Sequence, residues 1–329
     1  MKTIVVTQQD VPALLPMKEC VDLMARVLET TSRGDAVLPL RSMVWLPDRS
    51  GLLGLMPAYL GDPKILGLKL VSVFPKNHGT PYDSHQGVVV LFEVEHGRLL
   101  AVIDATSITA IRTAAASGAA TRLLAREDAH DLAILGSGVE ARTHLEAMRA
   151  VRSIQRVRVW SRNPENARAF ARREGVEAVA DAKAAVAGAD LICTTTASRE
   201  PVLHGDWIAP GAHINAVGAC FPTARELDTS AVKRARLYVD RRESTLNEAG
   251  DFLIPKSEGA IGDAHIVGEI GEVILGRVPG RGGPDEITLF KSLGIAVEDL
   301  AAAHHIHRAA LEQGKGLSIA LGGTRDAGG

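Results

Sequence analysis

The chain has 329 residues, which is long enough for two domains that each bury a core of their own. Hydrophobic residues make up 46% of it and charged residues 23%, and the formal net charge is -2, so the chain is typical of a globular protein. Its sequence has no run of massed Lys and Arg, so we expect no nucleic-acid partner. Cys20, Cys193 and Cys220 are far apart and form no CxxC pair, which indicates neither a disulfide framework nor a zinc knuckle.

The amino-terminal residues, MKTIVVTQQDVPALLP, lack the apolar core of a signal peptide. No apolar run approaches the roughly 18 residues that a membrane-spanning helix needs. Scattered thiols fit a reducing compartment. We therefore expect a cytoplasmic protein that has neither a membrane nor a nucleic acid as its partner.

The part of the chain before about residue 116 is expected to be rich in β-strands behind an opening helix at about residues 17–31. Its β-type runs are separated by Gly, Pro and Asn turns and predict a largely antiparallel or mixed sheet; they are GLLGLMPAYL, KILGLKLVSVF, GVVVLFEVEHG and RLLAVID. The alanine-rich run at 107–125 then predicts a long helix, with Asp104 or Ser107 as its cap.

From Asp131 to Asp240 the chain alternates β-type and helix-type runs. Several of the β-type runs are apolar on both faces, which is typical of a parallel sheet covered by helices. The predicted strands are 131–136, 156–161, 189–195, 213–218 and 235–240, and the predicted helices between the first of them are 140–150, 164–174 and 181–187. The predicted fold class is α/β, with a Rossmann-type doubly wound domain after an α+β amino-terminal domain.

The carboxyl-terminal part predicts one more helix, AVEDLAAAHHIHRAALEQG, followed by a glycine-rich tail, GKGLSIALGG, that we expect to be poorly ordered. His304, His305 and His307 share this helix, but the sequence supplies them with no further metal ligands, so we expect no metal site.

A glycine motif follows the first strand of the alternating region. Residues 136–141 read Gly-Ser-Gly-Val-Glu-Ala and match the G-x-G-x-x-(G/A) pattern of dinucleotide-binding loops. Gly136 allows a tight turn, Gly138 lets a pyrophosphate approach the backbone, and Ala141 lets the next helix pack closely on the strand. The free N–H groups of that helix attract phosphate. We expect Gly136, Ser137, Gly138, Val139 and Ala141 to bind the cofactor.

The end of the second strand indicates which dinucleotide is bound. NAD enzymes usually have an acidic residue there, whereas this chain has Ser161 and Arg162. A carboxylate repels a 2′-phosphate, and serine and arginine attract one. The sequence therefore favours NADP(H), with NAD(H) as the second possibility. The alternative is that Arg162 is an ordinary solvated arginine.

Four ionisable residues stand in surroundings that favour burial. Lys69 shares a strand face with Val71 and Val73, Arg112 belongs to the alanine-rich helix, Arg41 follows Leu38-Pro39-Leu40, and Asp228 follows the fourth predicted strand. Ordinary interpretations exist for each type: a lysine at a sheet edge, a surface arginine, and an aspartate that caps a helix. Spacing alone does not decide between these and a functional site.

At these residues the chain resembles the ornithine cyclodeaminase/mu-crystallin family over essentially its whole length. The segments that carry the resemblance are GLMPAYL, GLKLVSVFPKN, SHQGVVVLFE, ITAIRTAAASGAAT, LGSGVEARTHLEA, VWSRNPENA, INAVGA, RELD and DEITLFKSLGIAVEDLAAA. The resemblance implies a homodimer. It also implies a substrate-binding and dimerisation domain at 1–116 plus 302–329, and a dinucleotide-binding domain at 117–301.

The resemblance further implies roles for individual residues. Arg41, Lys69 and Arg112 would bind the substrate carboxylate, Asp228 would act beside the reacting carbon, and Ser84 and His85 would orient the substrate or a proton path. Lys69 and Asp228 are the expected catalytic residues. Further expected contacts of the cofactor are Thr113, Thr195, Val217, Gly218, Ser292 and Gly294.

Two departures from the family pattern narrow the reaction. Ornithine cyclodeaminases have a glutamate before Leu-Met-Pro that binds the distal amino group, and here Gly54 stands in that place. Ser84-His85-Gln86 is similar to the reductase and mu-crystallin branch. These residues favour an NAD(P)H-dependent reductase of imines next to a carboxylate, of the Δ1-pyrroline-2-carboxylate or Δ1-piperideine-2-carboxylate type, that gives an L-amino acid such as L-proline.

Three alternatives stay open from the sequence. The first is reductive amination of a 2-oxo acid by an alanine dehydrogenase, which needs the same carboxylate site. The second is an ornithine cyclodeaminase. The third belongs to another class of protein, a mu-crystallin-like protein that binds a small ligand without catalysis. The substrate in every case is a small molecule.

Overall fold

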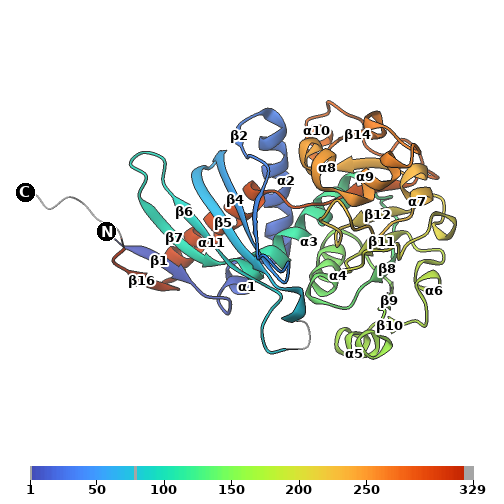
Figure 1. Ribbon diagram of the computed structural model, residues 1–329, viewed down its shortest axis with the longest axis horizontal. Coiled ribbons are helices and arrows are strands. Elements are labelled where there is room, and N and C mark those ends of the chain that lie inside the picture. Colours follow the sequence, from blue (N-terminus) through green and yellow to red (C-terminus); the bar gives the residue numbers. More distant parts are fainter. Residues whose placement is uncertain (1, 78–79, 322–329) are drawn as a thin grey trace, which may run out of the picture. The chain divides into compact units, whose positions relative to one another are not determined.

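The computed structural model describes residues 2–77 and 80–321, and these residues form two compact units (Figure 1). Unit 1 contains Met1–Arg112 and Ile295–Gly329, and unit 2 contains Thr113–Gly294. The sequence placed the divisions a few residues later, after 116 and after 301. The second division comes earlier because the last long helix, α11 (Ala296–Gln313), packs on α2 (Met17–Arg33) and on the strands of unit 1 from its first turn.

Unit 1 is built on a mixed sheet, as the sequence predicted. Its strands lie in the order β16-β1-β7-β6-β5-β4-β2, with β3 also paired to β4. Among the described strands β1 and β7 run parallel, and the neighbouring hairpins are antiparallel. The strands are β1 (Thr3–Val6), β2 (Ala36–Val37), β3 (Ser42–Trp45), β4 (Leu52–Gly61), β5 (Lys64–Val73), β6 (His85–Phe92), β7 (Leu99–Asp104) and β16 (Leu317–Ile319).

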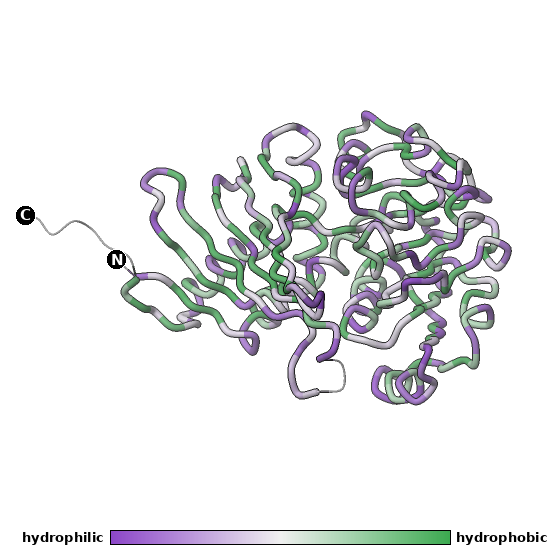
Figure 2. The backbone as a smooth tube through the Cα atoms, viewed as in Figure 1, coloured by the Kyte–Doolittle hydropathy of each residue, from purple (hydrophilic) through white to green (hydrophobic). Residues whose placement is uncertain are grey.

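Helices cover one face of this sheet. α11 packs on β4, β5 and β6 and against α2 (Met17–Arg33), while α1 (Val11–Leu14) and the short 3-10 turn η1 (Pro75–Asn77) lie between strands in the chain. Burial along β4 alternates residue by residue, because successive side chains point to opposite faces of a strand. In Figure 2 these strands are largely hydrophobic, and the tip of the β6–β7 hairpin is hydrophilic.

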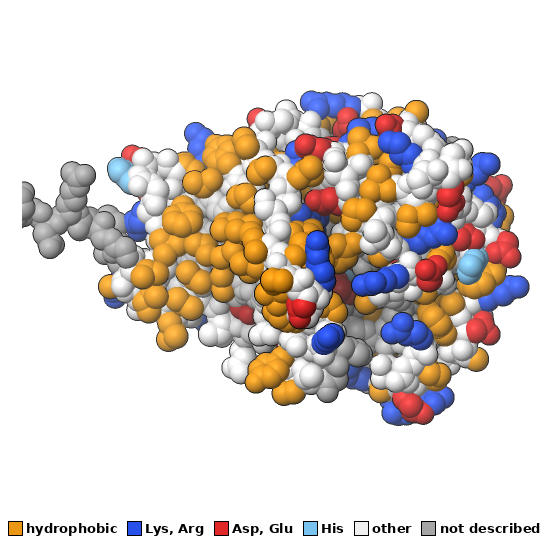
Figure 3. All heavy atoms as spheres, in the orientation of Figure 1, with side chains coloured by type: hydrophobic (Ala, Val, Ile, Leu, Met, Phe, Trp, Pro, Cys, Tyr) orange, Lys and Arg blue, Asp and Glu red, His pale blue; other side chains and the backbone are white. Residues whose placement is uncertain are grey.

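The opposite face of the unit 1 sheet is also apolar. Leu55 pairs with Leu70, Pro57 with Leu68 and Tyr59 with Leu66, so these side chains share that face. Figure 3 shows hydrophobic side chains gathered over this part of the molecule, and Leu66 keeps 45% of its surface exposed. Monomeric proteins rarely expose a large contiguous apolar patch, so this face is typical of an interaction surface.

The alanine-rich helix is α3 (Ala105–Leu124), and the chain passes from unit 1 to unit 2 within it. Asp104 is the residue that caps it, because its Oδ1 accepts a hydrogen bond from Ser107 N at 3.1 Å. Small alanines let the helix be buried nearly all around.

Unit 2 has the expected parallel sheet, in the order β10-β9-β8-β11-β12-β15-β13-β14. The order of the strands across the sheet reverses direction at β8, as in doubly wound dinucleotide-binding folds. The predicted Rossmann-type fold is therefore confirmed. The strands are β8 (Asp131–Leu135), β9 (Arg156–Trp160), β10 (Glu177–Ala178), β11 (Leu191–Thr194), β12 (His213–Ala216), β13 (Arg236–Val239), β14 (Ile266–Glu269) and β15 (Thr288–Lys291). All five predicted strands are present, and β10, β14 and β15 were not predicted.

Helices and 3-10 turns connect these strands. They are α4 (Val139–Val151), α5 (Pro164–Glu174), α6 (Ala182–Val186), η2 (Gly205–Trp207), α7 (Thr229–Arg234), α8 (Arg242–Glu248), α9 (Gly250–Ser257), η3 (Asp263–His265) and α10 (Ile270–Ile274). The hydrophobic core between sheet and helices contains Leu203, Leu227 and Phe252 among many smaller side chains.

The glycine-rich tail was expected to be poorly ordered, and for Leu317–Ile319 that prediction is wrong. These residues form β16, which pairs antiparallel with β1. The backbone N–H and C=O groups of an edge strand offer a template for another strand, and this pairing satisfies them. Residues 322–329 of the tail lie outside the described residues.

Within the described ranges, 2–77 and 80–321, no helix combines the length and the apolar character needed to cross a bilayer.

Candidate active site

The glycine motif forms a tight turn at the carboxyl end of β8. Gly136 has φ +127°, and a Cβ atom there would stand 2.5 Å from Thr195 Oγ1, so glycine is required. Gly138 is exposed, and a Cβ atom there would meet nothing within 4 Å. It precedes α4, whose start has no side-chain cap. The buried Ala141 fits the close packing of α4 on the sheet. The loop therefore has the geometry to receive a pyrophosphate on the helix N–H groups.

The end of β9 lies beside this loop. Gly136 N donates to Trp160 O at 2.8 Å, and Ser137 Oγ donates to Ser161 Oγ at 3.0 Å. Arg162 follows and is exposed, and Asn163 caps α5 through its side chain. This strand end presents hydroxyl, guanidinium and amide groups, with no carboxylate among residues 160–163. A dinucleotide fits here, and a 2′-phosphate meets no opposing charge from these residues.

Other residues expected at the cofactor follow the next strands of the same sheet. Thr195 comes after β11, Val217 and Gly218 come after β12, and Ser292 comes after β15. Gly294 N donates to Asp240 Oδ2 at 2.7 Å, which fixes the last of these loops. Val139 begins α4, and Thr113 is buried in α3, where unit 2 begins. Parallel strands bring their carboxyl ends to one sheet edge, where open α/β sheets bind their ligands.

Unit 1 contains a buried cluster of four charged side chains. Lys69 of β5 and Arg112 of α3 are 2% and 4% exposed, and Glu298 and Asp299 of α11 are fully buried. Asp299 Oδ1 accepts from both Lys69 Nζ, at 3.0 Å, and Arg112 Nε, at 2.9 Å. Arg112 Nη1 donates to Glu298 Oε2 at 2.9 Å. Two of the cations predicted to hold a carboxylate are thus brought together by one shared oxygen.

The cluster shifts the pKa of its members. Burial lowers the pKa of Lys69 to about 8, with Arg112 and Arg41 acting in the same direction and Asp299 opposing them. For Asp299, burial favours the neutral acid, but Arg112 and Lys69 outweigh it and the pKa lies below its usual range. A lysine with a pKa near neutrality can exchange a proton with a substrate as well as hold a charge.

Ser84, His85 and Arg41 belong to the same unit. Ser84 Oγ and His85 Nδ1 are 3.0 Å apart at the start of β6. His85 is exposed, and its pKa lies below its usual value because neighbouring atoms partly desolvate the ring and, to a smaller extent, because Lys69 repels a second positive charge. Arg41 is half-buried between β2 and β3. His85 and Arg41 therefore each interact electrostatically with Lys69, and Ser84 contacts His85.

Asp228 belongs to unit 2 and caps α7. Its Oδ1 accepts from Ala231 N at 2.7 Å and from Gly205 N at 3.0 Å, and its Oδ2 lies 3.1 Å from His204 Nδ1. Both oxygens are therefore engaged in local structure, which is the ordinary interpretation of this residue. The role expected for Asp228 beside the reacting carbon stays a prediction.

Sequence reasoning missed Glu298 and Asp299. Acidic residues in the first turn of a helix are common because they favour the positive end of the helix dipole, so these two looked ordinary. The sequence signal that could have identified them is the run Leu-Ala-Ala-Ala that follows, because it predicts burial of this part of the helix.

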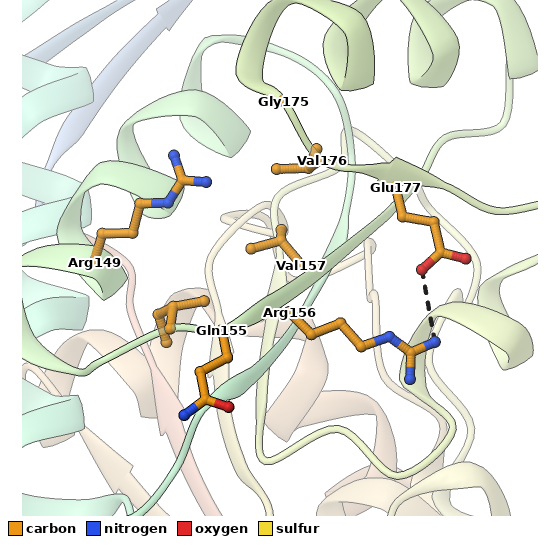
Figure 4. Close-up of a pocket in the computed structure, with 8 residues that line it drawn as sticks. Arg149, Gln155, Arg156, Val157, Gly175, Val176 and Glu177 are labelled. Carbon is orange, nitrogen blue, oxygen red and sulfur yellow. Dashed lines mark ion pairs between the residues drawn. The ribbon is translucent and has the colours of Figure 1, made fainter.

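A hollow of about 330 Å³ lies on unit 2 at the amino end of β9 (Figure 4). The glycine motif, in contrast, follows the carboxyl end of β8. The hollow is lined by Arg149, Gln155, Arg156, Glu177 and neighbouring apolar side chains, and Arg156 pairs with Glu177 at 3.6 Å. None of the predicted site residues lines it.

Comparison with known proteins agrees with this geometry. The model of the ornithine cyclodeaminase/mu-crystallin family matches residues 1–314. The ketimine reductase mu-crystallin of Mus musculus is 44% identical over 276 residues, which cover 83% of this chain and 85% of that protein.

Two solved structures are similar over nearly the whole chain. One is the Δ1-pyrroline-2-carboxylate reductase of Thermococcus litoralis in complex with NADH and L-proline, with a TM-score of 0.93 and 39% identity over 96% of this chain and 100% of that one. The other is an archaeal alanine dehydrogenase dimer with bound NAD, with a TM-score of 0.91 and 34% identity over 97% of this chain and 99% of that one. The chain belongs to the ornithine cyclodeaminase/mu-crystallin family.

Proposed function

We propose that this chain, an NAD(P)-dependent oxidoreductase, reduces the C=N bond of small cyclic imines that carry a carboxylate on the imine carbon. Δ1-pyrroline-2-carboxylate, which would give L-proline, and Δ1-piperideine-2-carboxylate are the substrates we expect. The observation that carries the proposal is the buried cluster in which Lys69 and Arg112 share Asp299 Oδ1.

Lys69 and Arg112 are proposed to bind the substrate carboxylate. A lysine ammonium has three N–H donors, and one of those of Lys69 goes to Asp299, so donors remain for a ligand. Arg112 is held through Nε and Nη1 by two acids, which fixes the plane of its guanidinium. In the best intramolecular cases, such positioning lowers the activation barrier by about 7–11 kcal/mol. Arg41 adds a third positive charge.

Reduction of an imine needs a hydride and a proton, and hydride is what the reduced nicotinamide supplies when it is bound. A protonated iminium accepts hydride more readily than a neutral imine. Lys69, with a pKa of about 8, is the group that we propose to hold and exchange this proton. Ser84 and His85 are proposed to orient the ring, and Asp228 to stabilise the iminium charge.

The dinucleotide is proposed to lie on the carboxyl edge of the unit 2 sheet, with its pyrophosphate on Gly136, Ser137 and Gly138. Ser161 and Arg162 support a preference for NADP(H), because both can donate to a 2′-phosphate. The two similar solved structures contain NADH and NAD, so NAD(H) is the second cofactor to test.

We propose a homodimer formed through the apolar outer face of the unit 1 sheet. The rows of paired residues on β4, β5 and β6 supply a continuous apolar surface, as Leu68 pairs with both Pro57 and Val90. A symmetric dimer would cover this face with its copy. The similar alanine dehydrogenase is a dimer. Cys20, Cys193 and Cys220 are free thiols, which supports a cytoplasmic location.

The proposal is tested with the purified chain and NADPH or NADH, offered Δ1-pyrroline-2-carboxylate, Δ1-piperideine-2-carboxylate, and pyruvate with ammonia or methylamine. Oxidation of the cofactor is followed by absorbance. Turnover of a cyclic imine that exceeds turnover of pyruvate with ammonia supports the proposal. Binding of the imine acids without turnover would instead indicate a binding protein.

Reductive amination of pyruvate is the second candidate, and the similarity to the archaeal alanine dehydrogenase favours it. Ornithine cyclodeamination has less support, because Gly54 offers no carboxylate to a distal ammonium. Gly54 lies on the same face of β4 as Met56, whose strand partner is Lys69. A side chain at this position would therefore lie near the proposed carboxylate site.

A further inference from the structure

A second network of buried polar side chains lies in unit 2, at the carboxyl ends of β11, β12 and β15. Its centre is Glu226, which is fully buried, and its other charged members, Asp251 and Lys291, are 2% and 1% exposed. These three side chains take no part in the mechanism above. Buried charges are costly unless they are paired and hydrogen-bonded, so the fold retains them at this edge only because their contacts compensate for burial.

Glu226 joins the segments that follow two neighbouring strands. Its Oε1 accepts from Thr196 N at 2.6 Å and from Thr196 Oγ1 at 2.7 Å, after β11. Its Oε2 accepts from Gly218 N at 2.7 Å, after β12, and from Thr194 Oγ1 at 2.8 Å. Gly218 comes so close to Thr196 that a Cβ atom would collide with the Thr196 carbonyl. One carboxylate thus fixes both segments.

Asp251 and Lys291 extend the network to the third strand. Asp251 Oδ1 accepts from Glu226 N at 2.8 Å and from Leu227 N at 3.0 Å, which fixes the segment that carries Glu226. Lys291 Nζ lies 3.1 Å from Asp251 Oδ2 and donates to Ala216 O at 3.2 Å. Because Lys291 ends β15 and Ala216 ends β12, these strand ends are held together.

We infer that Glu226, with Asp251 and Lys291, positions the nicotinamide half of the dinucleotide. In a doubly wound sheet the dinucleotide crosses the edge where strand order reverses, which is β8 here. The glycine motif and Ser161 belong to β8 and β9, the side of the adenosine half. The network belongs to β11, β12 and β15, the side of the other half. The inference rests on the proposed dinucleotide site.

The placement of the network among the expected contacts supports this assignment. Thr194 and Thr196 flank Thr195, Gly218 is itself an expected contact, and Lys291 precedes Ser292. The members of the network therefore need not touch the nicotinamide in order to place the backbone that does. They are positioning residues, and their loss is expected to act on one half of the cofactor.

Glu226→Gln tests the inference with little change in side-chain volume. Each carboxylate oxygen of Glu226 now accepts hydrogen bonds. In glutamine an NH2 group replaces one of these oxygens and faces the same donors, so at least one buried hydrogen bond is lost. The Kd is measured by titration of the full chain with NADPH, with NADH and with adenosine 2′,5′-bisphosphate, which represents the adenosine half alone. We expect the Kd of both dinucleotides to rise about tenfold or more and that of the bisphosphate to stay within about twofold.

Two further variants control for folding. Thr196→Val removes one of the four donors to Glu226 and is expected to weaken dinucleotide binding in the same direction by a smaller factor. Asp131→Asn removes a carboxylate that pairs with the buried Arg158 at the amino end of β8. It is expected to lower the melting temperature and to leave every Kd unchanged.

The outcomes separate the inference from the proposed function. A wild-type chain that binds neither dinucleotide would refute the proposed function. If the wild type binds and Glu226→Gln binds both dinucleotides equally well, the inference is wrong. It is also wrong if the variant loses the bisphosphate as strongly as the dinucleotides, because the network would then only support folding. If Glu226→Gln does not fold, the same comparison for Thr196→Val decides.

Discussion

Replacing Asp299 by asparagine removes the negative charge that Lys69 and Arg112 share. Its Oδ1 lies 3.0 Å from Lys69 Nζ and 2.9 Å from Arg112 Nε, inside the protein. Burial lowers the pKa of Lys69 to about 8, and Asp299 is the group that works against this shift. Without the charge, the pKa of Lys69 falls further and the lysine loses its proton at a lower pH. The variant should therefore lose the carboxylate site earlier as pH rises.

The size of the effect follows from the contact that is weakened. A hydrogen bond to a charged group contributes about 1.5–3 kcal/mol. Because about 1.36 kcal/mol corresponds to a factor of ten, kcat/KM for the imine should fall about 10- to 150-fold at neutral pH. The loss should grow as pH rises, because deprotonation of Lys69 removes one of the cations that hold the substrate.

The assay is the pH dependence of kcat/KM for Δ1-pyrroline-2-carboxylate with saturating NADPH. The wild type should lose activity above about pH 8, where Lys69 gives up its proton. In Asp299→Asn this alkaline limb should lie at lower pH. The substrate titrates identically in both assays, so the difference between the two profiles reports the protein.

Glu298→Gln is the matched control, because it removes an equal buried charge from the same helix. Its Oε2 accepts from Arg112 Nη1, whereas the acid that acts most strongly on the pKa of Lys69 is Asp299. Glu298→Gln should raise KM and move the alkaline limb less than Asp299→Asn does. The reasoning fails if a folded Asp299→Asn keeps the wild-type limb, or if Glu298→Gln moves it by the same amount.

Further predictions concern the rest of the molecule. Asp228→Asn should lose most turnover and keep cofactor binding if Asp228 stabilises the iminium. A lower melting temperature with full turnover would show that Asp228 acts only as the cap of α7. Arg162→Ala should raise KM for NADPH about tenfold and spare NADH, and equal losses with both would contradict the cofactor preference. Leu68→Glu, on the outer sheet face, should turn the proposed dimer into a monomer in sedimentation, whereas a wild-type monomer would contradict the dimer itself. Ornithine should not be converted to proline, because Gly54 provides no carboxylate; robust conversion would overturn the choice of reaction. Burial lowers the pKa of His144 to about 4 from an ordinary value of 6.5, so the unfolded chain binds the proton first and stability should fall as pH drops from about 6.5 to 4; a melting temperature that stays constant over that range would disagree.

The parts of the fold that sequence predicted have local causes. The turn at Gly136, the helix after it and the apolar strands around it each follow from residues within a few positions. β15 was missed because its four residues, Thr-Leu-Phe-Lys, carry a polar residue at each end and lie far along the chain from their neighbours in the sheet. It is a strand because it pairs with β12 and β13 on its two sides. β16 similarly depends on an edge of β1 that lies more than 300 residues away.

The candidate site was predicted only in part, because local sequence patterns identify single residues and not their distant partners. Lys69 and Arg112 were recognised because each is a charge among apolar neighbours, and the resemblance to a family gave them a role. Their partner Asp299 is 230 residues from Lys69, and no local pattern connects the two. Asp228 shows the opposite limit. The family resemblance gave it a catalytic role and its position before a short helix also allowed a cap, and its local contacts are those of a cap.

Buried lysines in the two units illustrate how contacts separate a ligand-binding cation from a structural one. A lysine buried in the core needs a carboxylate partner, so each apolar run that contains one implies an acid elsewhere. Lys69 meets this need with one bond to Asp299 and keeps donors for a substrate. Lys291 is paired with Asp251 and also donates to the carbonyl of Ala216, so its donors are directed at the ends of strands. The first arrangement leaves donors for a carboxylate, and the second uses a charge to hold backbone in place, which is why we propose a catalytic role for Lys69 and a positioning role for Lys291.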